Sequence, residues 1–89
     1  MAVVLIDDEQ SALHALTVML RALHYEVLPF NDPARALASL SAEVDLVIAD
    51  VNMPGMDGFT VAERVAERLG TQPPKVLLVT GADHEARLA

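Results

Sequence analysis

Three aspartates follow directly on short apolar runs of the sequence. Asp7 and Asp8 come after the run at residues 3–6, and Asp50 comes after the run at residues 46–49. If both runs are parallel strands, their carboxyl ends meet at one edge of the sheet, where ligands of such sheets bind. We therefore expect the three carboxylates to converge, although they lie far apart in the chain.

Converging carboxylates repel one another, which raises their pKa values unless a cation lies between them. No histidine or cysteine adjoins Asp7, Asp8 or Asp50, so the available ligands are oxygens, which favour Mg²⁺ or Mn²⁺ over zinc. Mg²⁺ keeps several waters and leaves a place for a phosphoryl oxygen. An aspartate beside such an ion can attack a phosphoryl donor and form an aspartyl phosphate.

Thr80 ends a further apolar run, at residues 76–79, and should face the same cleft. Its hydroxyl could donate to a phosphoryl oxygen, and Gly81 beside it permits a close backbone approach. Taken singly, each of these acids is typical of a turn or a helix cap. Taken together with Thr80, they favour a functional site.

The elements that must position these residues are four short strands and the helices between them. The runs at residues 3–6, 46–49 and 76–79 show no alternation, as in parallel strands buried on both faces. The run at residues 27–28 is short and stops at Pro29, so it should form an edge strand. The order β-α-β-α-β-α-β predicts right-handed crossovers and an α/β sheet.

The helices are marked by leucine spacing, caps and glycines. Leu13, Leu16, Leu20 and Leu23 define one face of a first helix. Asp32 and Pro33 predict the cap and first position of a second. A third should begin near Gly58, after Asp57 as a turn or cap residue, and end at Gly70. The apolar residues expected to be buried on it are Val61, Ala62, Val65 and Leu69. Residues 83–89 resemble the opening of a fourth helix.

Composition limits the function classes. The 89 residues suffice for one domain, and a hydrophobic content of 53% excludes disorder. No run reaches the length of a membrane span, the start does not resemble a signal peptide, and there is no cysteine. A net charge of −7 argues against nucleic-acid or membrane binding through a basic patch. It suits a bound cation or a basic partner surface, and we expect a cytoplasmic protein.

Three segments carry a resemblance to a known family. VLIDDE at residues 4–9, IADVNMPGMDG at residues 48–58 and LVTGA at residues 78–82 resemble the receiver domain of two-component response regulators. The resemblance covers essentially the whole chain. It implies a flavodoxin-like α/β fold, a doubly wound parallel sheet with strand order 2-1-3-4-5.

The resemblance also implies roles for individual residues. Asp50 would accept a phosphoryl group from a histidine kinase or phosphotransfer protein, and Thr80 would be the switch hydroxyl. Asp8 and Asp50 would ligate Mg²⁺, with Asp7 assisting through a water and Asn52 adding its backbone carbonyl. Pro54 and Gly58 match the loop after the phosphorylated strand. Such a domain is a signalling module and not a turnover enzyme.

The sequence departs from the family after the fourth strand. We expect residues 1–89 to form a C-terminally incomplete receiver domain, part of a longer regulator, with four strands in order 2-1-3-4 and the fifth βα unit missing. The fourth strand would then be an exposed edge through which the chain self-associates.

The family lysine of the fifth strand is missing as well. The only lysine, Lys75, begins the fourth strand, roughly 16 Å from the active edge. The alternative function is therefore a phosphorylation-deficient pseudo-receiver that acts as a docking or dimerisation module. A metal-dependent phosphohydrolase fits poorly, because those enzymes need two acids separated by one residue, whereas Asp7 and Asp8 are adjacent.

Overall fold

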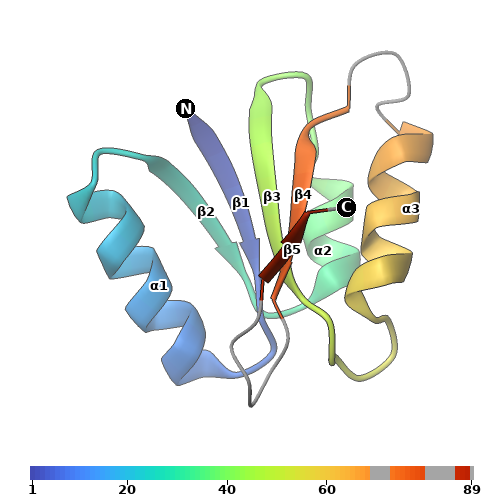
Figure 1. Cartoon of the computed structure of the whole chain (residues 1–89), viewed down its shortest axis with the longest axis horizontal. Coiled ribbons are helices and arrows are strands. Elements are labelled where there is room, and N and C mark those ends of the chain that lie inside the picture. The colour runs from blue at the N-terminus through green and yellow to red at the C-terminus, as the bar shows by residue number, and fades with distance from the viewer. Residues whose placement is uncertain (69–72, 80–85, 89) are drawn as a thin grey trace.

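A computed structural model describes residues 1–68, 73–79 and 86–88 of the chain (Figure 1). Strands and helices alternate as the sequence predicts up to the fourth strand. In chain order the elements are β1 (Ala2–Ile6), α1 (Gln10–Ala22), β2 (Glu26–Phe30), α2 (Pro33–Ala38), β3 (Val44–Asp50), α3 (Gly58–Arg68), β4 (Lys75–Val79) and β5 (Ala86–Leu88). None of the described helices is both long and apolar enough to cross a membrane.

The strands form one sheet in the order β2-β1-β3-β4-β5. The pairs β1–β2, β1–β3 and β3–β4 are parallel, which confirms the predicted α/β fold and the order 2-1-3-4. The central strands are apolar because both of their faces are covered. Val4 and Val47, for example, are fully buried.

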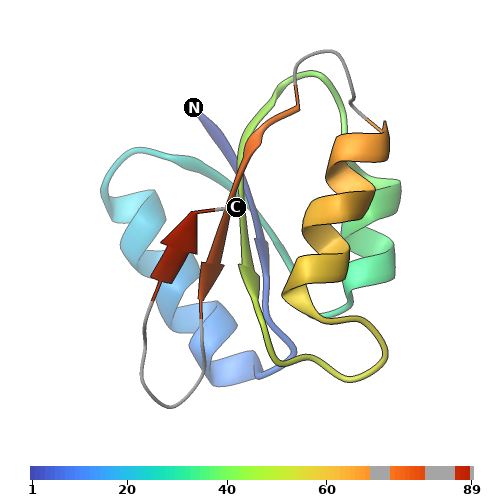
Figure 2. The same cartoon turned by 45° about the vertical axis from the view of Figure 1, so that its right-hand side comes forward.

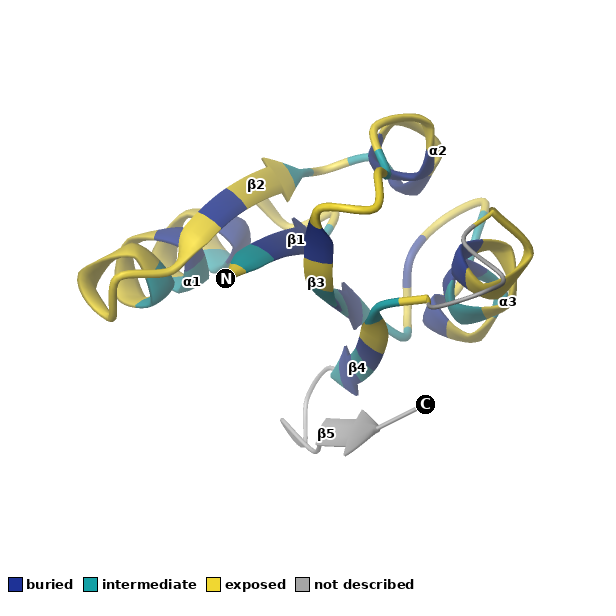
Figure 3. Cartoon of the chain, turned by 90° about the horizontal axis from the view of Figure 1, so that it is seen from above, coloured by how far each residue is buried: buried dark blue, intermediate teal, exposed yellow. Residues whose placement is uncertain are grey.

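The helices lie on both faces of the sheet. Of the described helices, α1 covers one face, whereas α2 and α3 lie side by side on the other (Figures 1 and 3). Successive residues of β1 alternate between the two layers. Leu5 packs in the cluster with Leu13 of α1, while Val4 and Ile6 belong to the larger cluster beneath α2 and α3.

Two helix starts follow local rules read from the sequence. Asp32 Oδ1 accepts the backbone N–H of Ala34 at 3.0 Å, and Pro33 occupies the first position of α2, as predicted. Asp57 Oδ1 accepts the backbone N–H of Thr60 at 2.8 Å before α3, which confirms its role as a cap. This bond lowers the pKa of Asp57.

The packing of the helices agrees with the expected faces in part. On α3, Val61 and Val65 are buried and Ala62 is half-buried, whereas Leu69 and Gly70 lie outside the described residues. On α1 only Leu13 of the four leucines is buried, and Leu23 is 61% exposed. Leu16 and Leu20 are half-buried and pack against the cluster that holds Leu13, so the predicted face is confirmed up to the C-cap residue Leu23.

Strand β2 is the edge strand, as predicted, but it does not stop at Pro29. It continues to Phe30, and Pro29 stands opposite Leu5 in the register with β1. An edge strand accommodates proline because one row of its backbone groups has no strand partner.

Residues 86–88 correct the expectation of a fourth helix beginning at residue 83. They form β5, which pairs antiparallel with β4 in the register Leu77↔Leu88, Leu78↔Arg87 and Val79↔Ala86 (Figure 2). Strand β4 is therefore not the exposed edge that the sequence predicted for self-association. The physical reason is that the outer backbone groups of β4 find partners in the returning chain.

A contact at Gly58 fixes how closely α3 approaches the end of β3. A Cβ on Gly58 would lie 2.8 Å from the carbonyl oxygen of Asp50 and 2.9 Å from Leu78 Cδ2. Real Cβ atoms do not come that close, so any larger residue displaces α3 from the strand. The backbone N–H of Gly58 donates to the carbonyl of Val51 at 3.0 Å, which closes the intervening loop.

We expect Gly58→Ala to destabilise the protein by about 1–3 kcal/mol, the usual cost of overpacking. Urea unfolding followed by circular dichroism measures the loss. Gly55→Asn is the matched control: a Cβ on Gly55 would have nothing within 4 Å, and asparagine tolerates the φ of +82° found there. The control meets no atom and carries only the strain of that φ, so it should lose less stability than Gly58→Ala. A Gly58→Ala protein as stable as the parent would show that the close approach is not needed.

Candidate functional site

The structure brings Asp7, Asp8 and Asp50 together at the carboxyl edge of the sheet. One carboxylate oxygen from each lies within 4.8 Å of those of the other two. Asp7 and Asp50 are half-buried and Asp8 is exposed. We refer to these three residues as the carboxylate trio.

Strand pairing explains the position of Asp7. Ile6 stands opposite Ala49 in the β1–β3 register, so the next residue on each strand is a member of the trio. The backbone N–H of Asp7 donates to the carbonyl of Phe30 at 3.1 Å, which extends the β1–β2 ladder by one residue. Asp7 Oδ1 in turn accepts the backbone N–H of Glu9 at 3.0 Å. Asp7 is thus held from both its backbone and its side chain.

Asp50 is held by the loop that follows it. It is the last residue of β3 and stands opposite Val79 in the β3–β4 register. Its Oδ1 accepts the backbone N–H of Asn52 at 3.1 Å, and the N–H of Val51 donates to the Val79 carbonyl at 2.9 Å. Met53, further along the loop, is 7% exposed and anchors it in the core. Packing therefore accounts for Met53.

Burial and repulsion act together on Asp7. Its pKa is raised above the ordinary value of 3.8, first by desolvation and then by the negative charges of Asp50, Asp8 and Glu9. The hydrogen bond from Glu9 N–H works in the opposite direction without overcoming these effects. The negative charges of the trio therefore repel one another, and a bound cation would offset this repulsion.

Glu9 has a role that the sequence does not reveal. Its position indicates only a negative charge near the first helix, but it is the N-cap of α1. Its carboxylate accepts the Ser11 hydroxyl at 2.7 Å and the backbone N–H groups of Ser11 and Ala12 at 3.1 and 2.9 Å. These bonds lower the pKa of Glu9. Glutamate is not among the favoured N-cap residues, so no sequence rule singles it out.

The donor set of the trio fits a hard divalent cation. It offers only carboxylate oxygens, the ligands that Mg²⁺ takes through one or two side chains while keeping its waters. Among the described residues, this is the one group of three metal-ligating side chains whose donor atoms converge. Asn52 follows the trio closely in the chain and is positioned by its bond to Asp50.

Two further sequence predictions concern β4. Thr80 lies outside the described residues, although Val79 before it is opposite Asp50. Lys75 begins β4 opposite Leu46 and is exposed. It therefore lies at the far end of the strand from the trio, as the sequence indicated.

Comparisons with known proteins give a consistent result. Residues 3–89 match the family described as the response regulator receiver domain. The response regulator PleD of Caulobacter vibrioides is 35% identical over 82 residues, which is 91% of this chain and 18% of PleD. The two-component response regulator ARR12 of Arabidopsis thaliana is 38% identical over 93% of this chain and 14% of its own length. The chain thus spans less than a fifth of these curated relatives.

Solved structures show the same likeness. The receiver domain of the hybrid histidine kinase CckA superposes with a TM-score of 0.81 and 33% identity, over 91% of this chain and 76% of that one. The response regulator TrrA of Thermotoga maritima, in complex with Mg²⁺–BeF, gives a TM-score of 0.80 and 30% identity over 93% of this chain and 71% of that one.

We expect Asp7→Asn to make the metal-free protein more stable at neutral pH. A carboxyl whose pKa is raised by folding contributes stability below its unfolded pKa and loses it as the pH rises through the folded-state pKa. The asparagine Oδ1 keeps the bond from Glu9 N–H but carries no charge. The gain should be at most about 1 kcal/mol, since the site is partly exposed.

Thermal unfolding in EDTA between pH 4 and pH 8 measures this effect. The difference between variant and parent should grow as the pH rises from 4 and level off once Asp7 is ionised in the folded protein. Glu63→Gln on the exposed side of α3 is the control and should show no such trend. A variant less stable than the parent at pH 8 would mean that the repulsion at the trio is not the dominant effect.

Proposed function

Because the chain belongs to the response regulator receiver family, we propose that it is a phosphoacceptor module in which Asp50 takes a phosphoryl group from a phosphohistidine. The donor is a histidine kinase or a phosphotransfer protein. The observation that carries this proposal is the convergence of the trio, with one oxygen of each carboxylate within 4.8 Å of the others. Asp50 is half-buried and is the last residue of the central strand β3, as a positioned nucleophile should be.

The transfer forms one bond and breaks another. An oxygen of Asp50 attacks phosphorus, the phosphorus–nitrogen bond of the phosphohistidine breaks, and the freed imidazole nitrogen takes a proton. We assign the attack to Oδ2, because Oδ1 already accepts the N–H of Asn52. The Val51 and Gly58 backbone bonds hold the loop while the Asp50 side chain gains charge and bulk.

The proposed cofactor is Mg²⁺, with Mn²⁺ as a substitute. Asp8, Asp50 and the backbone carbonyl of Asn52 would hold the ion, and Asp7 would contact it through a water. When bound, the ion offsets negative charge on the transferring group. The donor set of the trio supports this assignment, as does the Mg²⁺–BeF complex of the TrrA relative.

The proposed readout is a change in partner binding. Thr80 would act as the switch hydroxyl that donates to the phosphoryl group. Its place in the sequence directly after Val79, which is opposite Asp50, supports this role. Self-association remains a prediction, although β4 is paired with β5 and is not the surface that would carry it.

A second candidate is a docking module that is not phosphorylated. The observation that favours it is the position of Lys75, the only lysine of the chain, at the far end of β4 from the trio. If no cationic side chain joins the trio, transfer depends on the metal for positive charge. The module would then bind its partners in one state.

Acetyl phosphate with Mg²⁺ tests the proposed function. Intact-mass spectrometry should show one added phosphoryl group on the parent, which hydroxylamine removes. Asp50→Asn should abolish the adduct. Asp8→Asn should lower its yield at least about tenfold, the usual loss of metal-dependent activity when a metal contact is weakened. Glu63→Gln, an exposed carboxylate on α3, should react like the parent.

The docking module predicts a different pattern. The parent would gain no adduct, yet Mg²⁺ would still raise its melting temperature because the trio binds the ion. An adduct that persists in Asp50→Asn would refute Asp50 as the acceptor. A parent that neither reacts nor responds to Mg²⁺ would refute both the acceptor and the metal site.

A further inference from the structure

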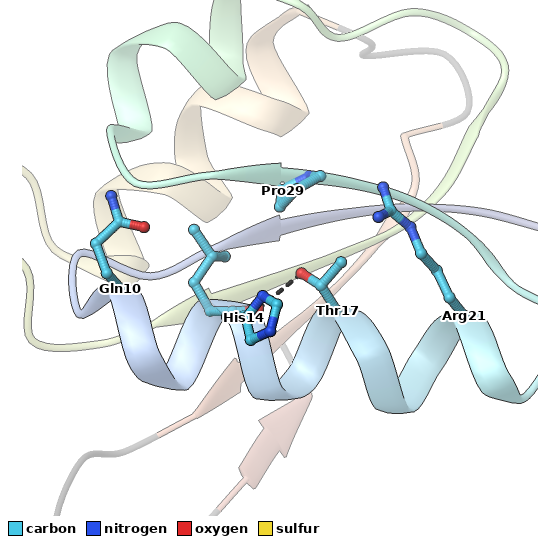
Figure 4. Close-up of a pocket in the computed structure, with 6 residues that line it drawn as sticks. Gln10, His14, Thr17, Arg21 and Pro29 are labelled. Carbon is cyan, nitrogen blue, oxygen red and sulfur yellow. Dashed lines mark hydrogen bonds between the residues drawn. The ribbon is translucent and has the colours of Figure 1, made fainter.

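A groove runs between helix α1 and edge strand β2, and its larger hollow reaches the carboxyl end of β2, beside the edge of the sheet that carries the trio. It consists of two adjoining hollows of about 210 and 330 Å³ that share Gln10, Leu13 and Pro29. We call it the α1–β2 groove. Leu13 and Thr17 form its floor on the helix, and the Thr17 hydroxyl donates to the Leu13 carbonyl at 2.7 Å (Figure 4). The floor is therefore apolar and offers no free hydroxyl.

The charge of the groove is opposite to that of the chain. The whole sequence has 13 acidic and 6 basic residues, yet two of those bases, Arg21 and Arg35, line the groove. His14 lines it as well. None of the acidic residues that the structure describes contributes to either lining.

Two acids near the groove, outside the trio, are engaged as helix caps. Glu9 caps α1 and Asp32 caps α2, each through bonds from backbone N–H groups. Their carboxylates are thereby tied to the helix ends. The arginines are not neutralised by a carboxylate within the groove itself.

The two arginines stand at opposite ends. Arg21 lines only the smaller hollow, and Arg35 lines only the larger one, which lies at the carboxyl end of β2 with Phe30 and Asn31. On α1, Arg21 comes eleven positions after Gln10, a rise of about 16 Å. Figure 4 shows the Arg21 side chain extending from α1 toward β2. One Nη2–H of Arg21 donates to the Val27 carbonyl at 3.0 Å, which positions a guanidinium that has five donors.

We propose that the α1–β2 groove binds an acidic peptide segment of a partner protein. An extended segment of about five residues covers the roughly 16 Å along α1 between Gln10 and Arg21. Acidic side chains at its two ends meet Arg21 and Arg35, and an apolar side chain between them covers Leu13 and Pro29. A single small anion does not reach both arginines. This site does not depend on phosphorylation of Asp50.

The direct test uses a labelled peptide with glutamate at both ends, leucine in the centre and alanine between. Fluorescence anisotropy with the full chain should show saturable binding that weakens as salt increases. The same peptide with glutamine at both ends should bind about four- to twenty-fivefold more weakly, since two ion pairs are lost. Equal binding of the two peptides would overturn the proposal.

Variants locate the site. Arg21→Gln and Arg35→Gln should each weaken the acidic peptide about two- to fivefold, as expected for partly exposed ion pairs. Arg21→Lys keeps the charge and should retain most of the affinity, which separates a loss of charge from a loss of folding. Arg64→Gln, on the exposed side of α3 behind the sheet, is the matched control and should bind like the parent.

Three results would contradict the groove as a peptide site. A loss in Arg64→Gln as large as in Arg21→Gln would indicate unspecific attraction. Competition by inorganic phosphate at constant ionic strength would indicate a small-anion site. If the peptide moved the amide NMR resonances of α3 and not those of Leu13 and Thr17 on α1, it would bind at another surface. Asp50→Asn should bind the peptide unchanged, so a failure here leaves the proposed function intact.

Discussion

The parallel pairing of β1 with β3 is the constraint on which the site depends. Because Ile6 is opposite Ala49, the residues that follow reach the same edge of the sheet. The ladder then continues one step beyond the strands: the N–H of Asp7 reaches the Phe30 carbonyl, and the N–H of Val51 reaches the Val79 carbonyl. The backbone therefore fixes the carboxylates before any ion is present, and their mutual repulsion follows from the fold.

The core tolerates this repulsion because the stabilising interactions are larger. Burying one valine or leucine side chain contributes about 1.5–3 kcal/mol, and both central strands are apolar on the two faces covered by helices. Repulsion between partly exposed carboxylates costs on the order of 1 kcal/mol per pair. A sheet of this composition can thus hold a costly cluster at its edge. Gly58 also supports the site, because the absence of a Cβ lets α3 pack against the end of the strand that carries Asp50.

What could be predicted from the sequence is what local chemistry dictates. Non-alternating apolar runs indicated the buried parallel strands, and Asp32 with Pro33 indicated the start of α2. The parallel strands in turn predict that the trio converges, because their carboxyl ends share one edge of the sheet. β5 could not be predicted, because a three-residue strand has no recognisable periodicity and forms only through its partner β4. The cap by Glu9 was missed for a related reason: a long carboxylate caps a helix only where the chain geometry returns it to the N–H groups. The prediction that β2 stops at Pro29 was wrong, because an edge strand can accept a proline.

The net charge of the chain is a poor guide to what its surfaces bind. A total of −7 argues for cations and basic partners, and the carboxylate trio agrees with that inference. Binding, however, responds to the local field, and charges of one sign gathered in a groove outweigh a distant excess of the other once salt screens beyond about 8–10 Å. The folding of α1 against β2 places Arg21 and Arg35 along one groove whose lining includes none of the acidic residues that the structure describes, while Glu9 and Asp32 are tied to helix caps. One small domain can therefore have a cation site at the carboxylate trio and a site for acidic groups in the α1–β2 groove. The fold separates acidic from basic side chains that are intermixed in the sequence.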